Sequence, residues 1–199
     1  MHGIDPRSKY TLIALLENRP GVLNRVVSLF RRRGFNLDSL TVGRTDRDDL
    51  SRMTLVIDGT RAEAVRAERE LCKLINVVRV DHLNGKSVSR DLALIKVGVT
   101  PEIRSEVMHI CEVFRARVVD VAKDSVIVEL TGDEPKIEGF VELLRPIGIV
   151  EMVRAGLVAM GRGGNVLDRN GFESSWAKHR QALAGEETMA GATPARSIA

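Results

Sequence analysis

The period of the hydrophobic positions changes abruptly near the start of the chain. Residues 10–16 read Tyr-Thr-Leu-Ile-Ala-Leu-Leu, an apolar and β-branched run without a helical period, so we predict a strand over about residues 9–17. Beyond residue 21, the apolar positions fall on one helical face, at Val22, Leu23, Val26, Val27 and Phe30. Three arginines followed by Gly34 are typical of a helix end, because cations and a left-handed glycine suit the last turn.

Strand and helix patterns continue in the same way up to residue 83. Residues 36–44 and 51–58 predict two strands joined by the polar turn 45–49, and residues 77–83 predict a closing strand. Residues 62–75 predict a second helix, whose inward side chains are Val65, Leu71, Cys72 and Ile75. The first half of the chain therefore has the element order βαββαβ.

The second half repeats this order with little sequence identity to the first. Residues 92–99 predict a strand, and Thr100-Pro101-Glu102 begins a helix with proline in its first turn and an acidic residue behind it. The apolar stripe of this helix is formed by Ile103, Val107, Ile110, Cys111 and Phe114. The remaining predicted elements are strands at 117–122 and 125–131, a helix at 135–144 and a strand at 149–160.

Two βαββαβ units predict an α+β protein made of two ferredoxin-like sandwiches, each with both helices on one face of an antiparallel sheet. We place the first domain at residues 9–84 and the second at residues 88–160, with Asn84-Gly85-Lys86-Ser87 as the linker. Residues 161–199 are rich in Gly, Ala, Ser and Thr, so we expect a mostly flexible tail with at most a short helix near residues 176–183.

In each predicted sandwich, one face of the sheet carries no helix and needs another cover. Alternate strand residues can line such a face, and the candidates are Leu40, Val42, Met53, Leu55 and Ile57. An exposed apolar sheet of this size indicates a partner surface, so we expect a homodimer or a contact with another protein.

The composition limits the possible classes of function. The 199 residues are 44% hydrophobic, 29% charged and 4% aromatic, and the formal net charge of +3 is spread over the predicted helices. Such interspersed charge indicates a solvated surface, so we expect no nucleic-acid partner. The chain shows no secretory signal and no apolar run of about 20 residues, so we expect a cytoplasmic protein without a membrane partner. Cys72 and Cys111 both fall on helical apolar stripes and are expected to be buried free thiols.

Nothing in the sequence predicts catalysis. The four histidines are scattered without metal-ligand spacing, and the common hydrolase, zinc-protease and nucleotide-binding motifs do not occur. RNA-recognition domains share the βαββαβ order, but they need aromatic residues on their central strands, and residues 36–44 and 51–58 contain none. We therefore expect no catalytic residue, no metal and no cofactor on this chain.

The corner at residues 18–21, which reads Asn-Arg-Pro-Gly, is the candidate binding site. A strand that turns into a helix presents backbone N–H groups and the positive end of a helix dipole, and both favour a carboxylate or phosphate. Purely structural roles fit the same residues: Asn18 as a helix cap, Pro20 and Gly21 as a corner, and Asn36 as a turn residue. The residues alone leave both interpretations open.

Three blocks of sequence resemble the small regulatory subunit of acetolactate (acetohydroxyacid) synthase. They are residues 18–26, 33–42 and 50–54, which read NRPGVLNRV, RGFNLDSLTV and LSRMT. The first block is typical of ACT domains in general, which bind amino acids, whereas the second and third are more specific for this family. The resemblance extends over about residues 9–163 and leaves the tail out.

The resemblance implies a non-catalytic subunit in branched-chain amino-acid biosynthesis. In this family, a large catalytic subunit holds thiamine diphosphate, a divalent metal such as Mg, and FAD, and it condenses two 2-oxoacids. The small subunit raises the activity of the large one and confers feedback inhibition by valine, or by leucine or isoleucine. The effector lies between paired ACT domains, which implies a homodimer. A free-standing ACT-domain sensor that acts on another enzyme or a transporter is the alternative, but it would need only the first block.

The effector positions of the family match Asn18, Gly21 and Asn36 in this chain. N–H groups near Gly21 and Val22 can bind the effector's carboxylate, and the side-chain oxygens of the two asparagines can accept from its ammonium group. Apolar side chains beside them can contact the branched side chain of valine. We therefore expect an effector site formed by Asn18, Arg19, Pro20, Gly21, Val22, Leu23, Asn36 and Leu37.

Overall fold

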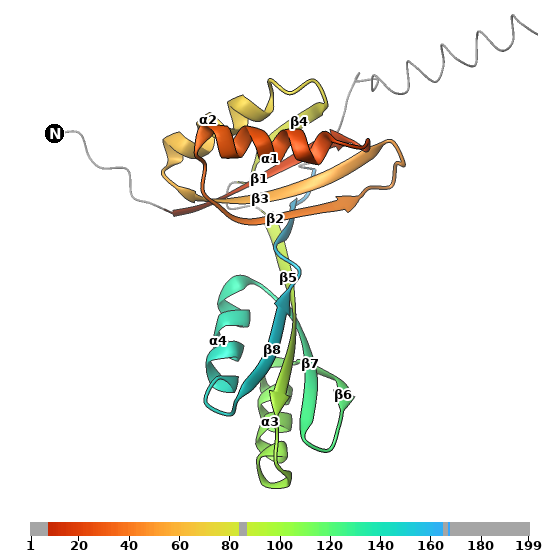
Figure 1. Cartoon of the computed structure of the whole chain (residues 1–199), viewed down its shortest axis with the longest axis vertical. Coiled ribbons are helices and arrows are strands. Elements are labelled where there is room, and N and C mark those ends of the chain that lie inside the picture. Colours follow the sequence, from red (N-terminus) through yellow and green to blue (C-terminus); the bar gives the residue numbers. More distant parts are fainter. Residues whose placement is uncertain (1–7, 84–86, 165–166, 168–199) are drawn as a thin grey trace, which may run out of the picture.

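The computed structural model describes residues 8–83, 87–164 and 167, which form two helix-and-sheet units joined by a long strand (Figure 1). In the first unit, two helices lie on one face of a four-stranded antiparallel sheet with the strand order β2-β3-β1-β4. Its elements are β1 (Ser8–Glu17), α1 (Val22–Arg33), β2 (Leu37–Arg44), β3 (Leu50–Gly59), α2 (Arg61–Leu71) and β4 (Val77–His82).

The second unit has the same order of elements and the equivalent strand order β6-β7-β5-β8. Its elements are β5 (Ser87–Gly98), α3 (Pro101–Phe114), β6 (Arg117–Val121), β7 (Ser125–Gly132), α4 (Glu134–Leu144), β8 (Ile149–Arg154) and β9 (Val158–Gly161). The prediction of an α+β protein with two ferredoxin-like βαββαβ units is therefore confirmed. Of the predicted tail, the structure describes residues 161–164 and 167, and the segment near 176–183 lies outside the described residues.

Each unit packs its helices on its own apolar core. In the first unit, Leu12, Leu55 and Phe30 are almost fully buried between the sheet and the helices, and in the second, Ile95, Leu130 and Phe140 are their counterparts. The predicted stripe of the helix at 101–114 is confirmed, because Val107 and Cys111 are buried and Ile103, Ile110 and Phe114 pack against the second core. None of the helices within the described ranges is long and apolar enough to span a membrane.

The predicted final strand at residues 149–160 is in fact two strands. It breaks at Gly156, whose φ of 85° lies in the left-handed region that suits glycine. The second piece, β9, leaves the sheet of the second unit and pairs with residues 87–90 of β5. The strand β5 is therefore longer than the predicted 92–99, and Ser87, which we placed in the linker, is its first residue. Residues 84–86 of that linker lie outside the described part of the chain.

The second predicted helix is shorter than expected, and of its predicted inward residues Leu71 is fully buried and Val65 is partly buried, whereas Cys72 and Ile75 are not. A capping box between Thr60 and Glu63 starts α2, and the helix ends at Leu71. Small alanines on this helix are fully buried against the sheet, whereas Ile75 lies past the helix end and is 75% exposed. The prediction that Cys72 is buried is wrong for the same reason, since it follows the last helical residue and is exposed. The prediction is right for Cys111, and its burial raises the pKa of its thiol.

The candidates for the helix-free face of the first sheet also need correction. Met53, Leu55 and Ile57 pack in the core beneath the helices, and Leu40 packs against the same core. The opposite face is formed by alternate residues such as Ile13 and Val56, which are buried as well. On this side β9 packs against β1, and the Arg52 guanidinium donates to the carbonyl of Ala159 at 2.8 Å. The chain itself therefore contributes to covering the first sheet.

Candidate functional site

The corner between β1 and α1 leaves the start of α1 without a side-chain cap. The N-cap residue is Gly21, with φ 83° and ψ −10°, and among the described residues no side chain caps the first turn. The first N–H groups of a helix lack partners within the helix, and the first turn of α1 contains no acidic residue. This helix end therefore favours a small anion, as expected from the sequence.

Asn18 is not a helix cap. Its backbone N–H donates to Asp49 O at 2.8 Å, and its side-chain Nδ2 donates to Asp48 O at 2.9 Å. Both bonds tie the corner to the turn between β2 and β3. Because the amide nitrogen is used in this way, the side-chain oxygen is the atom of Asn18 suited to accept from an ammonium group.

The next three residues form a tight turn that presents the start of the helix. The Val22 N–H donates to Arg19 O at 3.3 Å, and the Gly21 carbonyl accepts from the Arg25 N–H at 3.1 Å. The bond of Val22 is long for an N–H···O contact, so a carboxylate would be a stronger acceptor for this N–H. Pro20 has no N–H to offer, so any carboxylate here is bound by the N–H groups that follow it.

A buried polar cluster that the sequence did not predict supports the corner from behind. The Glu17 side chain is fully buried, accepts from Asn76 Nδ2 at 2.7 Å and lies 3.7 Å from Arg19 Nη1. Arg25 Nη1 donates to Asn76 Oδ1 at 2.7 Å. The one available signal was an acidic residue at the end of an apolar strand, next to the candidate site.

Asn36 and Leu37 lie at the other end of α1. The Asn36 Nδ2 donates to Asp58 Oδ2 at 3.2 Å, and Leu37 packs half-buried against the first core. A helix of 12 residues is about 18 Å long, so a single chain keeps Asn36 well away from Asn18. Within one chain, the structure therefore brings residues 18–23 together but does not join residues 36–37 to them.

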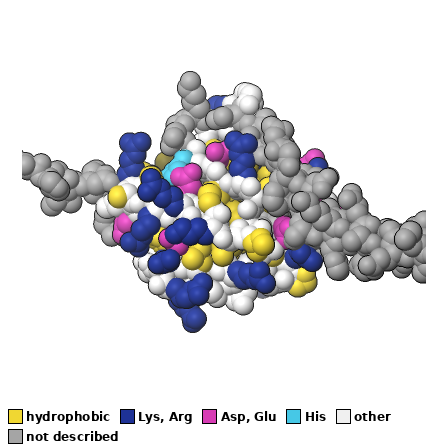
Figure 2. Space-filling view, turned by 90° about the horizontal axis from the view of Figure 1, so that it is seen from above, with side chains coloured by type: hydrophobic (Ala, Val, Ile, Leu, Met, Phe, Trp, Pro, Cys, Tyr) yellow, Lys and Arg dark blue, Asp and Glu magenta, His cyan; other side chains and the backbone are white. Residues whose placement is uncertain are grey.

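Two apolar residues of α1 that we expected to face inward lie on the surface. Leu23 is 43% exposed and Val27 is 42% exposed, whereas Val22, Val26, Leu29 and Phe30 are buried. Val42 on the edge strand β2 is exposed as well. From above, hydrophobic side chains form a band among numerous Lys and Arg side chains at this end of the molecule (Figure 2). Such exposed apolar residues beside an open sheet edge are typical of a contact surface.

Family models match both units. Residues 12–79 match the ACT domain of acetohydroxyacid synthase (AHAS) small-subunit-like proteins, and residues 90–163 match the small subunit of acetolactate synthase. Each match falls on one of the two sandwiches described above.

Individual relatives agree with these matches. A probable acetolactate synthase small subunit of Archaeoglobus fulgidus is 52% identical over 155 residues, which is 78% of this chain and 98% of the relative. The acetolactate synthase small subunit of Mycobacterium leprae is 46% identical and is covered to 92%, against 77% of this chain. The crystal structure of the Thermotoga maritima small subunit superposes with a TM-score of 0.74 at 36% identity, over 79% of this chain and 99% of that one. The chain therefore belongs to the family of acetolactate synthase small subunits.

Proposed function

We propose that this chain is the regulatory subunit of an acetolactate synthase, which activates a large catalytic subunit and makes it sensitive to feedback inhibition by valine, or by leucine or isoleucine. The observation that carries the effector part of the proposal is the uncapped start of α1 at Gly21, beside the side-chain oxygen of Asn18. The chain itself is non-catalytic in this proposal. Thiamine diphosphate, Mg and FAD belong to the catalytic subunit.

The chemistry of the corner fits an α-amino acid. The N–H groups after Pro20 bind the carboxylate, and the side-chain oxygen of Asn18 accepts from the ammonium group. Leu23 is exposed in the next turn and supplies apolar surface for a branched side chain. A phosphate fits less well, because it would need cations around it. Arg25 is already bonded to Asn76 in the buried cluster, and Arg19, the cation of the corner itself, lies 3.7 Å from the buried Glu17.

A second copy of the chain completes this site. Two copies whose α1 helices run antiparallel place Asn18 of one beside Asn36 of the other, because these residues mark opposite ends of the same helix. The exposed Leu23 and Val27 on α1 and Val42 on β2 supply apolar surface for such a contact. The proposal is thus a homodimer with the effector between two ACT domains.

An effector at the contact of two chains can regulate a third. A ligand that bridges two subunits favours the arrangement in which both halves of its site are closed, by a coupling free energy of about 1–3 kcal/mol. The catalytic subunit, bound to the same dimer, then senses this arrangement. Activation and inhibition are separable in this scheme, because activation does not need the effector.

The test is a valine titration of the reconstituted holoenzyme with wild type, Gly21→Asp and Gly163→Asp. Gly21→Asp places a negative charge where the carboxylate binds, so inhibition should weaken at least about tenfold while activation remains. Gly163 is a matched control, since it also has a positive φ, of 63°, and open space around it. Equal inhibition of all three holoenzymes would remove Gly21 from the site, and failure of the wild type to activate any acetolactate synthase would refute the regulatory role.

A further inference from the structure

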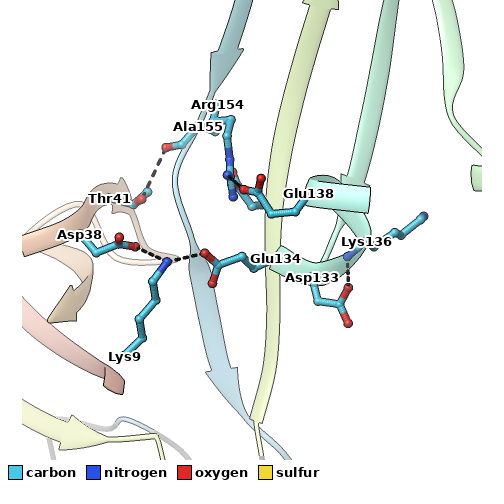
Figure 3. A network of polar contacts seen from close by, with 10 residues as sticks. Lys9, Asp38, Thr41, Asp133, Glu134, Lys136, Glu138, Arg154 and Ala155 are labelled. Carbon is cyan, nitrogen blue, oxygen red and sulfur yellow. Dashed lines mark hydrogen bonds and ion pairs between the residues drawn. The ribbon is translucent and has the colours of Figure 1, made fainter. Parts of the chain in front are cut away.

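A cavity lies between the two units, at the opposite end of β1 from the effector corner. It has a volume of about 670 Å³, and its walls come from β1, β2 and β3 on one side and from β5, the start of α4 and the loop before β9 on the other. Figure 3 shows several of its charged lining residues, namely Lys9, Asp38, Asp133, Glu134, Glu138 and Arg154. A cavity with walls from both units is a site whose occupant contacts both of them at once.

The lining of this cavity carries more acid than base. Five carboxylates and two cations face it, which leaves an excess of three negative charges. The two cations are already bound. Lys9 lies between Asp38, at 3.2 Å, and Glu134, and thereby links the two units. Arg154 lies between Asp91, at 2.6 Å, and Glu138, at 2.5 Å.

Two buried polar atoms at this cavity lack partners among the described residues. Asp91 is 3% exposed, and while its Oδ2 binds Arg154, its Oδ1 has no hydrogen-bond partner. The Oγ of Ser39 on β2 is also buried without one. Both residues line the cavity, one from each unit. A buried carboxylate oxygen without a donor is costly, so it favours a ligand that carries one.

An organic cation can supply such a donor, and a metal ion fits this cavity less well. Within the described ranges, no three acidic, His or Cys side chains converge on a point where they could hold a metal ion. The cavity is also too roomy for a single small ion, and its charge excess is spread over both walls. Primary and secondary ammonium groups, each with several N–H donors on a flexible chain, match this distribution.

We propose that the cavity between the two units binds a small aliphatic polyamine, with one ammonium group donating to Asp91 Oδ1 and Ser39 Oγ. The ligand supplies hydrogen-bond donors and positive charge to the lining carboxylates that Lys9 and Arg154 do not neutralise. Because it contacts both units, it stabilises the arrangement shown in Figure 3. This site is distinct from the effector corner, but its lining residues Asp38 and Ser39 directly follow Asn36 and Leu37. Its occupant does not require valine.

The test is isothermal titration of spermidine into the full chain, compared with MgCl₂ at matched ionic strength. Spermidine should bind saturably, and Asp91→Asn should weaken it about tenfold or more, since a charged partner is lost. Glu112→Gln is the control with the same charge change, because the Glu112 side chain is 81% exposed on α3. Its affinity for spermidine should stay within about twofold of wild type.

Two further results decide the proposal. Ser39→Ala keeps every charge and should weaken spermidine about threefold, so it serves as the deciding variant if Asp91→Asn does not fold. No saturable heat with wild type, equal weakening by Asp91→Asn and Glu112→Gln, or equal binding of Mg²⁺ at the same ionic strength would each overturn it. Unchanged spermidine binding in Ser39→Ala, when Asp91→Asn is unfolded, would also overturn it.

Discussion

The two units share one order of elements but differ at the corner where their first strand meets their first helix. In the first unit, α1 begins at a left-handed glycine, with no acidic residue in its first turn. In the second unit, α3 begins with Pro101, which has no N–H, and Glu102 follows it. A hydrogen bond from Thr100 lowers the pKa of Glu102, so this helix start carries its own negative charge. A repeated fold thus keeps one corner open to an anion and closes the other.

Disrupting one core at a time should give the largest difference between the two units. Leu55→Ala in the first unit and Leu130→Ala in the second each remove a fully buried side chain and should cost about 2–5 kcal/mol of unfolding free energy. Only Leu55→Ala should also weaken valine inhibition, because only the first unit carries the effector corner. Urea denaturation of each variant and valine titration of its holoenzyme measure the two effects. Equal loss of inhibition in both variants would contradict the separation.

The buried cluster behind the open corner offers a second test. Glu17→Ala leaves Asn76 without its acceptor and should cost about 1–3 kcal/mol of unfolding free energy. It should also raise the valine concentration for half inhibition, since Glu17 directly precedes the corner. Glu129→Ala in the second unit is the control, because its ion pair with Arg117 is long, at 3.9 Å, and the Arg117 side chain is 80% exposed. A corner that works independently of this cluster would give Glu17→Ala normal inhibition.

The side chains at the two corners can be compared directly. Asn18→Ala removes the proposed acceptor of the ammonium group and should weaken valine binding about tenfold to a hundredfold, the effect of one hydrogen bond to a charged group. Thr100→Ala, at the equivalent corner of the second unit, should leave valine binding unchanged. Calorimetric titration of valine into each variant gives the two affinities. Identical affinities for both variants would show that Asn18 does not contact the effector.

The ends of the same two helices give the smallest expected effect. Both end in a left-handed residue, which is Gly34 with φ 68° after α1 but Arg115 with φ 54° after α3. Arg115→Gly should therefore raise the unfolding free energy by about 1 kcal/mol, and Gly34→Ala should lower it by a similar amount. Thermal unfolding of both variants would show shifts of opposite sign. A destabilised Arg115→Gly would mean that the arginine side chain outweighs its backbone strain.

Local rules predicted the elements well where a single residue type decides the outcome. Gly21 and Gly34 mark the two ends of α1 because few other residues accept a positive φ. Pro101 starts α3 because proline suits the first turn of a helix. The order of elements then specified the two sandwiches. The identities of the effector residues came from the resemblance, because one asparagine in a turn has several possible roles.

The features that the sequence did not predict share a different cause, since each depends on which parts of the chain lie next to one another in the fold. Leu23 and Val27 follow the helical period of α1 as well as Val26 does, yet they are 43% and 42% exposed, because the described elements cover that side of the helix only in part. The pairing of Glu17 with Asn76 joins residues 59 positions apart in the chain. β9 runs toward the first unit because the strand breaks at Gly156, and the hydrophobic periodicity of the sequence gives no sign of this break.

The strand β5 has a consequence for how the two units can move. Residues 87–90 pair with β9 beside the first sheet, and residues 91–98 are an inner part of the second sheet, so one unbroken strand of 12 residues runs from the side of the first sheet into the second. This strand is a rigid connection about 40 Å long, so the two units can twist about it but can hardly bend relative to one another. The orientation of the two units about this strand is also fixed, because the side chains of neighbouring residues point to opposite sides of it. One residue inserted between Arg90 and Asp91 would therefore rotate one unit by about half a turn relative to the other.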